Sequence, residues 1–313
     1  MVQPSNPLNI AETLRQSILS VLGAPPDPAP LEPTTLEMIS ASGLRLEHIK
    51  YHVSPNDSGY AYLMWQEGLR TPAPTVILHH PEGNYADGKA SVAALGSGNT
   101  PAEELAQLGF VVLVPDAIGY GRRRSPLSTG PAYDEQHTYH QGAVLLLRGE
   151  TLLHKVLWDL SRAVDLLETR PEVDRRHIGI IGQGYGARMA LWGMAFEPRL
   201  VAGVGHSGII SYRDTLRRGL WFQPEFVVPR LMQVADLHHL LTLIAPRPFL
   251  ISTVEGDPHT GDAAEIFQRG LPAYQKTGSH YRLSHYHYRT GVGFERHMRF
   301  NAYTWLQSWL MPY

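Results

Sequence analysis

The turn GQGYG at residues 182–186 is where the types and spacing of residues point most directly to chemistry. It follows a short apolar segment, 177–181, and precedes a helix predicted from about Tyr185. A strand, this turn and a helix make up the nucleophile elbow G-x-S-x-G, whose central serine attacks the substrate. The central residue here is Gly184. Because glycine has no side chain, a covalent intermediate through position 184 is excluded.

Two other interpretations of the same turn are open. Gly182, Gly184 and Ala187 also fit G-x-G-x-x-A, the fingerprint of dinucleotide binding. That fingerprint requires an acidic residue about 20 positions later, after the next strand. The next predicted strand, 200–204, runs into GHS at 205–207, without an acid. Alternatively, the glycines only allow a strand and a helix to pack closely. We therefore predict no bound cofactor.

Titratable side chains follow several predicted strands directly. His79, His80 and Glu82 follow segment 75–79, His206 follows 200–204, and Asp257 follows 249–253. Since open α/β sheets bind ligands at the carboxyl ends of their strands, these five residues are the predicted catalytic groups. Each also has a structural interpretation: a buried histidine bonded to backbone, a solvated glutamate, or an aspartate that binds loop amides.

The elbow itself offers further groups to a ligand. The backbone N–H of Tyr185 is a predicted donor to a developing oxyanion, and we place the side chains of Gln183 and Tyr185 in the pocket. A metal site is not predicted. His285 and His287 alternate on one strand near His280, but no carboxylate completes a recognisable ligand set.

The elements that must position these residues alternate along the chain. Segments 36–39, 44–52 and 61–65 alternate in polarity and predict antiparallel edge strands. Later apolar segments are separated by amphipathic helices, which predicts a mostly parallel central sheet flanked by helices. The predicted class is α/β. Residues 1–33 form an N-terminal helix and a proline-rich strap, and 34–313 form one domain. Insertions are expected at about 117–150, a long, polar, glycine-rich excursion, and at 211–245, a mostly helical segment that is a candidate lid.

Several stretches resemble the α/β-hydrolase superfamily, in particular its dienelactone-hydrolase and acetyl-esterase-like branch. They are TVILHH, FVVLVPDAIGYGRR, the run from 148 through the elbow, PRPFLISTVEGDP and MRFNAYTWLQSWL. The resemblance implies a Ser–acid–His triad in that chain order. It puts the nucleophile at Gly184, the acid at Asp257 or else Asp262, and the histidine at Val292, with His287 as the alternative. The implied triad is therefore degenerate.

Composition narrows the classes of protein further. The net charge of −2 does not suggest binding to nucleic acid, and the absence of cysteine excludes disulfides and thiolate sites. The N-terminal residues lack a signal-peptide pattern, and no apolar run suggests a membrane span, so we expect a cytoplasmic protein. Its expected partner is a small molecule, and the N-terminal helix and strap are compatible with a homodimer.

Three hypotheses about function follow. The first is an enzyme that uses acid–base and oxyanion chemistry on a small carbonyl or ester-like compound, as a lyase, cyclase or isomerase. The second is a non-catalytic protein that has kept the substrate pocket of a hydrolase and binds a ligand there without converting it. The third is an ester or lactone hydrolase that activates water, with Asp257 or a histidine as the base. Fold alone does not choose among them.

Overall fold

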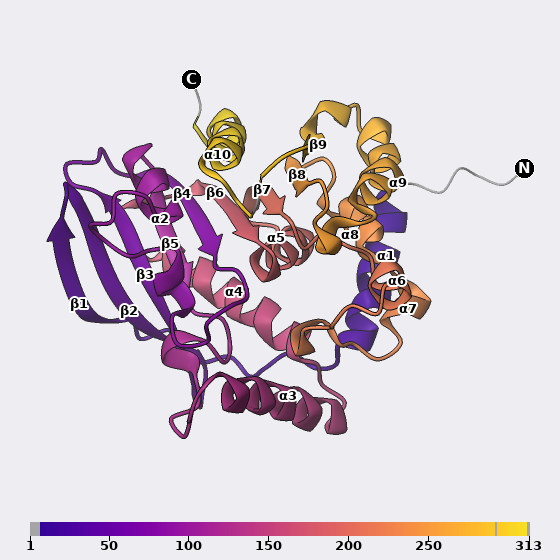
Figure 1. Cartoon of the computed structure of the whole chain (residues 1–313), viewed down its shortest axis with the longest axis horizontal. Helices are drawn as coiled ribbons and strands as arrows, with labels where there is room; N and C mark the ends of the chain where they lie inside the picture. Colours follow the sequence, from indigo (N-terminus) through magenta and orange to yellow (C-terminus); the bar gives the residue numbers. More distant parts are fainter. Residues whose placement is uncertain (1–6, 292, 312–313) are drawn as a thin grey trace, which may run out of the picture.

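The computed structural model describes residues 7–291 and 293–311. Within them, one sheet contains nine strands in the order β1-β2-β3-β5-β4-β6-β7-β8-β9 (Figure 1). The strands are β1 (Thr34–Ala41), β2 (Leu44–Ser54), β3 (Asp57–Gln66), β4 (Ala73–His79), β5 (Val111–Pro115), β6 (Val173–Gln183), β7 (Leu200–His206), β8 (Phe249–Val254) and β9 (Leu283–Tyr288). The first three pair antiparallel, as does β3 with β5, and all other pairs are parallel. The predicted sheet with antiparallel strands at its N-terminal side is confirmed.

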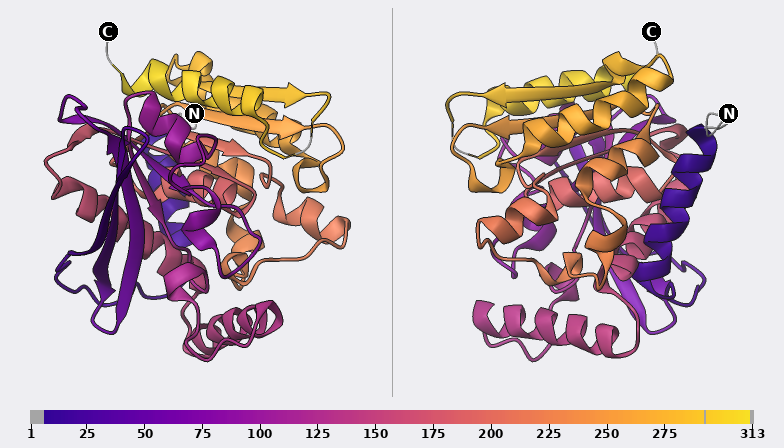
Figure 2. Two further views of the ribbon diagram at one scale, coloured as in Figure 1. Left: turned by 60° about the vertical axis from the view of Figure 1, so that its left-hand side comes forward. Right: turned by 90° about the vertical axis from the view of Figure 1, so that its right-hand side faces the viewer.

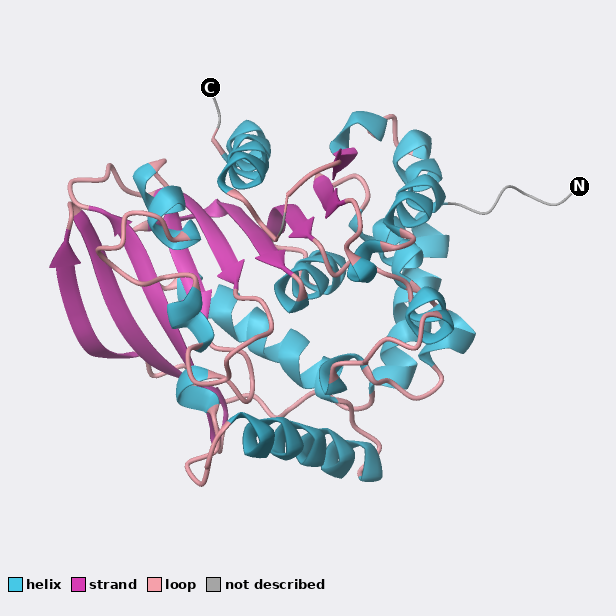
Figure 3. Cartoon of the chain, viewed as in Figure 1, coloured by secondary structure: helices cyan, strands magenta, loops and turns pink. Residues whose placement is uncertain are grey.

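Helices cover both faces of the sheet (Figure 3). One face carries α2 (Pro101–Gln107) and α10 (Arg296–Leu310), and the other carries α4 (Leu152–Glu168), α5 (Tyr185–Phe196), α8 (Leu237–Ile244) and α9 (Ala263–Lys276). The central strands have apolar residues on both sides because both faces are covered. In β5 and β8 every residue is buried, whereas edge strand β1 is exposed along almost its whole length.

The N-terminal helix α1 (Pro7–Leu22) packs on the body of its own chain. It lies against α7 (Leu231–Val234) and α8, and the guanidinium of Arg15 donates to the carbonyl of Ala195 at 2.8 Å. The hydroxyl of Thr151 donates to the carbonyl of Leu22 at 2.7 Å. These contacts leave the predicted homodimer untested. In the part of the chain that the structure describes, no helix has the length and apolar character needed to cross a membrane.

The two insertions differ from each other in how well they were predicted. Segment 117–150 was predicted as a polar, glycine-rich excursion with no helix assigned to it. It contains the helix α3 (Pro131–Leu147), which lies at the periphery of the molecule (Figure 2). Its buried positions, Asp134, Thr138 and Gly142, have helical spacing but lack apolar side chains, so the helix has no apolar stripe to recognise. Segment 211–245 is helical as predicted, with α6 (Tyr212–Arg217), the short helix η3 (Pro224–Phe226), α7 and α8. Its role as a lid stays a prediction.

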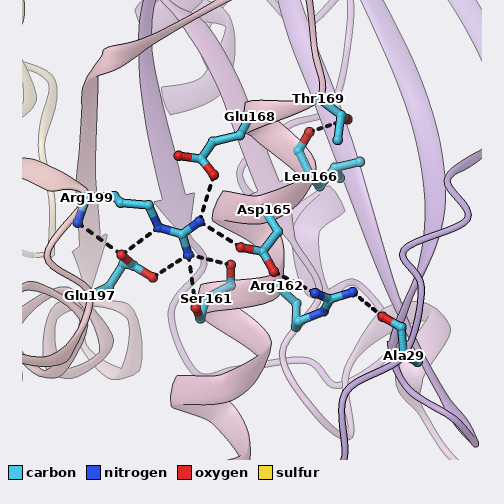
Figure 4. A network of polar contacts seen from close by, with 9 residues as sticks. All are labelled: Ala29, Ser161, Arg162, Asp165, Leu166, Glu168, Thr169, Glu197 and Arg199. Atoms are coloured by element: carbon cyan, nitrogen blue, oxygen red, sulfur yellow. Dashed lines mark hydrogen bonds and ion pairs between the residues drawn. The ribbon is translucent and has the colours of Figure 1, made fainter.

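A polar network joins α4, the C-terminal end of α5 and the strap (Figure 4). The guanidinium of Arg199 contacts Asp165 at 2.7 Å and Glu168 at 2.9 Å, both on α4, and Glu197 at 2.7 Å. Arg162 donates to Asp165 at 2.6 Å and to a backbone carbonyl of the strap at 2.5 Å. The network fixes α5, the helix that the elbow begins, against its neighbour.

Replacing Arg199 by alanine is expected to lower the free energy of unfolding by about 1–3 kcal/mol, because three partly buried carboxylates lose a charged partner. Urea denaturation at neutral pH measures the change. Arg176→Ala is the matched control, since this side chain is 84% exposed and pairs only with Asp174. It should change the free energy by less than about 0.5 kcal/mol. Equal effects of the two variants would mean that the network contributes nothing beyond a surface ion pair.

Candidate active site

The elbow geometry is present at Gly184. Strand β6 ends at Gln183, helix α5 begins at Tyr185, and Gly184 between them has φ 57° and ψ −115°. The backbone crowds the turn on both sides. A Cβ at Gly182 would lie 2.3 Å from the backbone of Gly186, and a Cβ at Gly186 would lie 2.4 Å from a carbonyl oxygen of β4. The glycines therefore serve close packing as well as the elbow.

The carboxylate of Glu82 takes the place that a side chain at position 184 would need. A Cβ built on Gly184 would lie 2.2 Å from Oε2 of Glu82. The same oxygen accepts a hydrogen bond of 2.5 Å from the backbone N–H of Tyr185. This N–H is the donor that an elbow presents to an oxyanion, so in this structure the glutamate occupies both the nucleophile space and the oxyanion donor.

His80 and His206 are held by hydrogen bonds at both ring nitrogens. Nδ1 of His80 donates to the carbonyl of Pro81 at 2.8 Å, and its Nε2 accepts from the N–H of Ala117 at 3.1 Å. In His206, Nε2 donates to the carbonyl of Gly293 at 3.0 Å, and Nδ1 accepts from the hydroxyl of Ser252 at 2.7 Å. Burial lowers the pKa of His206 to about 4 and also lowers the pKa of His80. These contacts favour the structural interpretation of both histidines.

His79 is buried at the end of β4, and neither ring nitrogen has a hydrogen-bond partner among the described residues. Its ring lies edge-on to Tyr185, with 6.4 Å between the ring centroids. Burial lowers the pKa of His79 to about 3, so the ring is neutral at physiological pH. Two cavities, of about 550 and 250 Å³, open beside the elbow, and His79 lines neither of them. The structure thus places it beside the ring of Tyr185 and outside the lining of both cavities.

Replacing His79 by leucine is expected to make the protein less sensitive to acid. The folded-state pKa lies below the ordinary value of 6.5, so the unfolded state binds the proton more readily. The stability that the neutral ring of His79 contributes is therefore fully present above about pH 6.5. As the pH falls below this value, the free energy of unfolding decreases by up to about 1.4 kcal/mol per pH unit. Unfolding free energies at pH 7 and pH 4.5 measure this, with half-buried His52→Gln as the control. An unchanged difference between the two pH values would contradict the prediction.

The acid candidates lie apart from each other. Asp257 follows β8, and its Oδ1 accepts from the N–H of His259 at 2.9 Å, which is the loop-binding role foreseen as its structural alternative. Asp262 accepts from the N–H of Ser211 at 3.1 Å, and burial raises its pKa. Only Asp257 lines a cavity that reaches Gly184.

The predicted triad-histidine position, Val292, lies outside the described residues. The alternative, His287, is on the exposed edge strand β9 and lines neither cavity. Nδ1 of His287 lies 3.0 Å and Nε2 of His285 lies 2.8 Å from the same hydroxyl, that of Thr253. Across residues 7–291 and 293–311, no three histidine, aspartate or glutamate side chains are grouped to hold a metal ion.

Two cavities meet at the elbow, at the carboxyl ends of the parallel strands. Their volumes are about 550 and 250 Å³, and both are lined by Glu82, Gly184, Gly208 and His259. Gln183 and Asp257 line the larger cavity. Tyr185 lines the smaller one, whose aromatic wall also includes Tyr85, Tyr120, Tyr139 and Trp221. The structure therefore brings together Glu82, Gln183, Gly184, Tyr185 and Asp257, but not the three histidines.

Three residues of these cavities were missed from the sequence. Arg188 is one turn into α5 and only 7% exposed; its Nε donates to the carbonyl of Gly208 at 2.9 Å, and within the described residues no carboxylate pairs with it. Its presence in the otherwise apolar helix YGARMALWGMAF was an available signal. His259 stands two residues after Asp257. Glu225 belongs to the insertion that follows β7, where no periodicity marks it.

The Dienelactone hydrolase family matches residues 94–279, which is more than half of the chain. The chain belongs to this family. A relative in Bacillus subtilis (strain 168), YtaP, which is described provisionally as a hydrolase, is 27% identical over 95% of this chain and 98% of its own. This member of the dienelactone hydrolase family thus matches that relative over nearly its full length.

Solved structures with the same fold include two carbohydrate-related esterases. A Bacteroides fragilis NCTC 9343 protein, described provisionally as an acetyl xylan esterase, has a TM-score of 0.74 at 15% identity and covers 91% of this chain and 78% of its own. A glucuronoyl esterase from Solibacter usitatus has a TM-score of 0.67 at 16% identity, with 94% and 91% covered. At such identities these likenesses show the fold alone.

Membership of the dienelactone hydrolase family bears on the three hypotheses about function only at the level of the general class of reaction. The family is named for a hydrolase and its Bacillus subtilis relative is described provisionally as one, which supports an enzyme and agrees better with the hydrolase alternative than with a lyase, cyclase or isomerase. Nothing in the comparisons supports the three latter reactions, and the mechanism without serine is untested by them.

Proposed function

We propose that this protein hydrolyses an ester of a small polyhydroxylated molecule, a carbohydrate ester, by activating water at Glu82. The observation that carries the proposal is the position of this carboxylate. Its Oε2 is held at the elbow by the N–H of Tyr185, in the space that the Cβ of any side chain at position 184 would need. A carboxylate fixed beside a substrate cavity is suited to remove a proton from water as a general base.

The chemistry needs no acyl-enzyme. Water bound to Glu82 attacks the ester carbonyl, the carboxylate accepts the proton, and the carbonyl oxygen becomes an oxyanion. Because Glu82 engages the N–H of Tyr185, the positive charge for this oxyanion comes from Arg188, which lines the same cavity and has no ion-pair partner among the described residues. A buried guanidinium without a carboxylate is a strong electrostatic stabiliser in a site of low dielectric constant. Glu82 thereby replaces Asp257 and the histidines as the proposed base.

The shape and lining of the smaller cavity support the substrate class. Aromatic rings form much of its wall, and Trp221, which is 61% exposed, lies edge-on to Tyr139 with 5.0 Å between the ring centroids. Flat rings beside a few polar groups suit the apolar faces and hydroxyl groups of a sugar. Relatives described as esterases of acetylated xylan and of glucuronoyl groups agree with this choice.

The test is turnover of p-nitrophenyl acetate, of acetylated xylo-oligosaccharides and of a lactone panel, combined with intact-protein mass after treatment with a fluorophosphonate. We expect steady turnover with no burst phase and no covalent label. Stoichiometric labelling would show that another side chain is the nucleophile. Absence of turnover across the whole panel would overturn the proposal and favour a ligand-binding protein.

A further inference from the structure

A second carboxyl group, that of Glu225, lines the same 250 Å³ cavity as Glu82 and Gly184. It belongs to η3 and is only 3% exposed. Its own backbone N–H donates to it, but no basic side chain among the described residues pairs with it. A buried, unpaired carboxyl that faces a substrate cavity has no structural partner to explain it.

The groups around Glu225 are mostly uncharged phenols. Tyr85 and Tyr120 approach from the loops after β4 and β5, Tyr139 from α3, and Tyr185 from α5. Burial raises the pKa of each phenol, and the charge of Glu225 adds a smaller increase. Glu82, His259 and Arg188 line the same cavity, but none forms an ion pair with Glu225. On α4, Lys155 and Asp159 contact each other and the cluster of Arg123 and Asp57.

The two carboxyl groups of this cavity differ in their surroundings. Burial raises the pKa of Glu225 to about 7, which keeps its carboxyl protonated in slightly acid and near-neutral solution. Glu82 is largely exposed and accepts a backbone hydrogen bond at its Oε2, a contact that suits a carboxylate. Two carboxyl groups that share a cavity and differ in this way can serve as acid and base.

We propose that Glu225 is the general acid of the hydrolysis, donating its proton to the alcohol that leaves. The inference rests on the proposed function and adds the residue that completes it. The single observation behind it is the juxtaposition of two unlike carboxyl groups in one cavity at the elbow: Glu82 is exposed and bonded to the N–H of Tyr185, and Glu225 is buried without a basic partner among the described residues.

The step balances without a cofactor. Water loses one proton to Glu82 as its oxygen bonds to the carbonyl carbon. The tetrahedral intermediate then collapses, the bond from carbon to the alkoxide oxygen breaks, and this oxygen takes the proton of Glu225. The products are a carboxylic acid and an alcohol, and proton exchange with solvent returns Glu82 to carboxylate and Glu225 to carboxyl. An alkoxide of a sugar is a poor leaving group, so protonation matters most for that substrate.

The experiment compares leaving groups in Glu225→Gln, which keeps the size of the side chain. We expect kcat/KM for methyl or sugar esters to fall by about 100-fold, and for p-nitrophenyl esters to change by less than about 3-fold, because nitrophenolate leaves without a proton. We also expect the alkaline decline of the wild-type pH profile near pH 7 to disappear. Glu135→Gln, on the exposed side of α3, is the control and should behave as wild type.

The outcomes separate the inference from the proposed function. If the wild type hydrolyses no ester, both are overturned. If esters are hydrolysed but Glu225→Gln keeps the wild-type dependence on the leaving group, only the inference falls; the same applies if His259→Gln alone changes that dependence. A readout independent of turnover is the infrared carbonyl band of a protonated carboxyl group. It should be present at pH 6, absent in Glu225→Gln and retained in Glu135→Gln, and its persistence in Glu225→Gln would also overturn the inference.

Discussion

Glu82→Gln is expected to lower kcat/KM for ester hydrolysis by about 100- to 10,000-fold while leaving the fold unchanged. Glutamine has the same shape as glutamate, and its amide oxygen can still accept from the N–H of Tyr185 at the elbow. What the variant loses is the capacity to remove a proton from water. The loss should therefore lie mainly in kcat, because the size of this side chain and all other residues that line the cavities are kept.

The measurement is steady-state kinetics on one activated and one alkyl ester, with thermal unfolding as the check on folding. Asp87→Asn is the matched control, since Asp87 lies on the same loop as Glu82 but lines neither cavity at the elbow. It should retain wild-type kinetics. Glu82→Asp should retain only part of the activity, because the shorter side chain cannot reach Tyr185 and the water at once. Activity of Glu82→Gln within about 3-fold of wild type would remove Glu82 as the base.

The fold could be predicted from the sequence because its signals are local. Buried parallel strands such as 75–79 and 110–115 are continuous apolar runs, and the alternation in 44–52 and 61–65 marks strands with one polar face. The helix within 117–150 was not assigned from the sequence, and there is a physical reason for this. Helix α3 buries Asp134, Thr138 and Gly142. These residues have helical spacing, but they are not apolar, so the sequence shows no amphipathic pattern.

The site could be predicted only in part. Gly184 was found from the elbow motif, and Glu82 was found because the carboxyl ends of parallel strands meet at one edge of the sheet. Glu225 was not, because its place depends on how an insertion folds back over α5. Arg188 was visible in the sequence but not interpreted. The histidines were predicted as catalytic groups, but the structure favours structural roles for two of them. Their positions after strands suggested catalysis, yet the contacts of His80 and His206 with backbone and serine favour positioning roles that a sequence does not reveal.

Gly184→Ala is expected to impair activity and stability for different reasons. With φ at 57°, alanine at this position should cost about 1–2 kcal/mol of stability from backbone strain alone. Its Cβ, 2.2 Å from Oε2 of Glu82, must also push the carboxylate away from the N–H of Tyr185. We therefore expect kcat/KM to fall almost as far as in a variant that lacks the carboxylate.

A double-mutant cycle with Glu82→Ala separates the two effects. If the activity of Glu82 depends on its hydrogen bond to the N–H of Tyr185, Gly184→Ala should reduce kcat/KM strongly in the wild-type background. In the Glu82→Ala background it should have almost no effect on kcat/KM, because the carboxylate that it would displace is already absent. The loss of stability that backbone strain causes should remain in both backgrounds. Gly68→Ala is the control for strain, since Gly68 has φ 74° and open space where a Cβ would stand. It should lower stability and spare activity. Additive losses of activity in the cycle would mean that Gly184 and Glu82 act independently, and that the family's serine position has not been taken over by the glutamate.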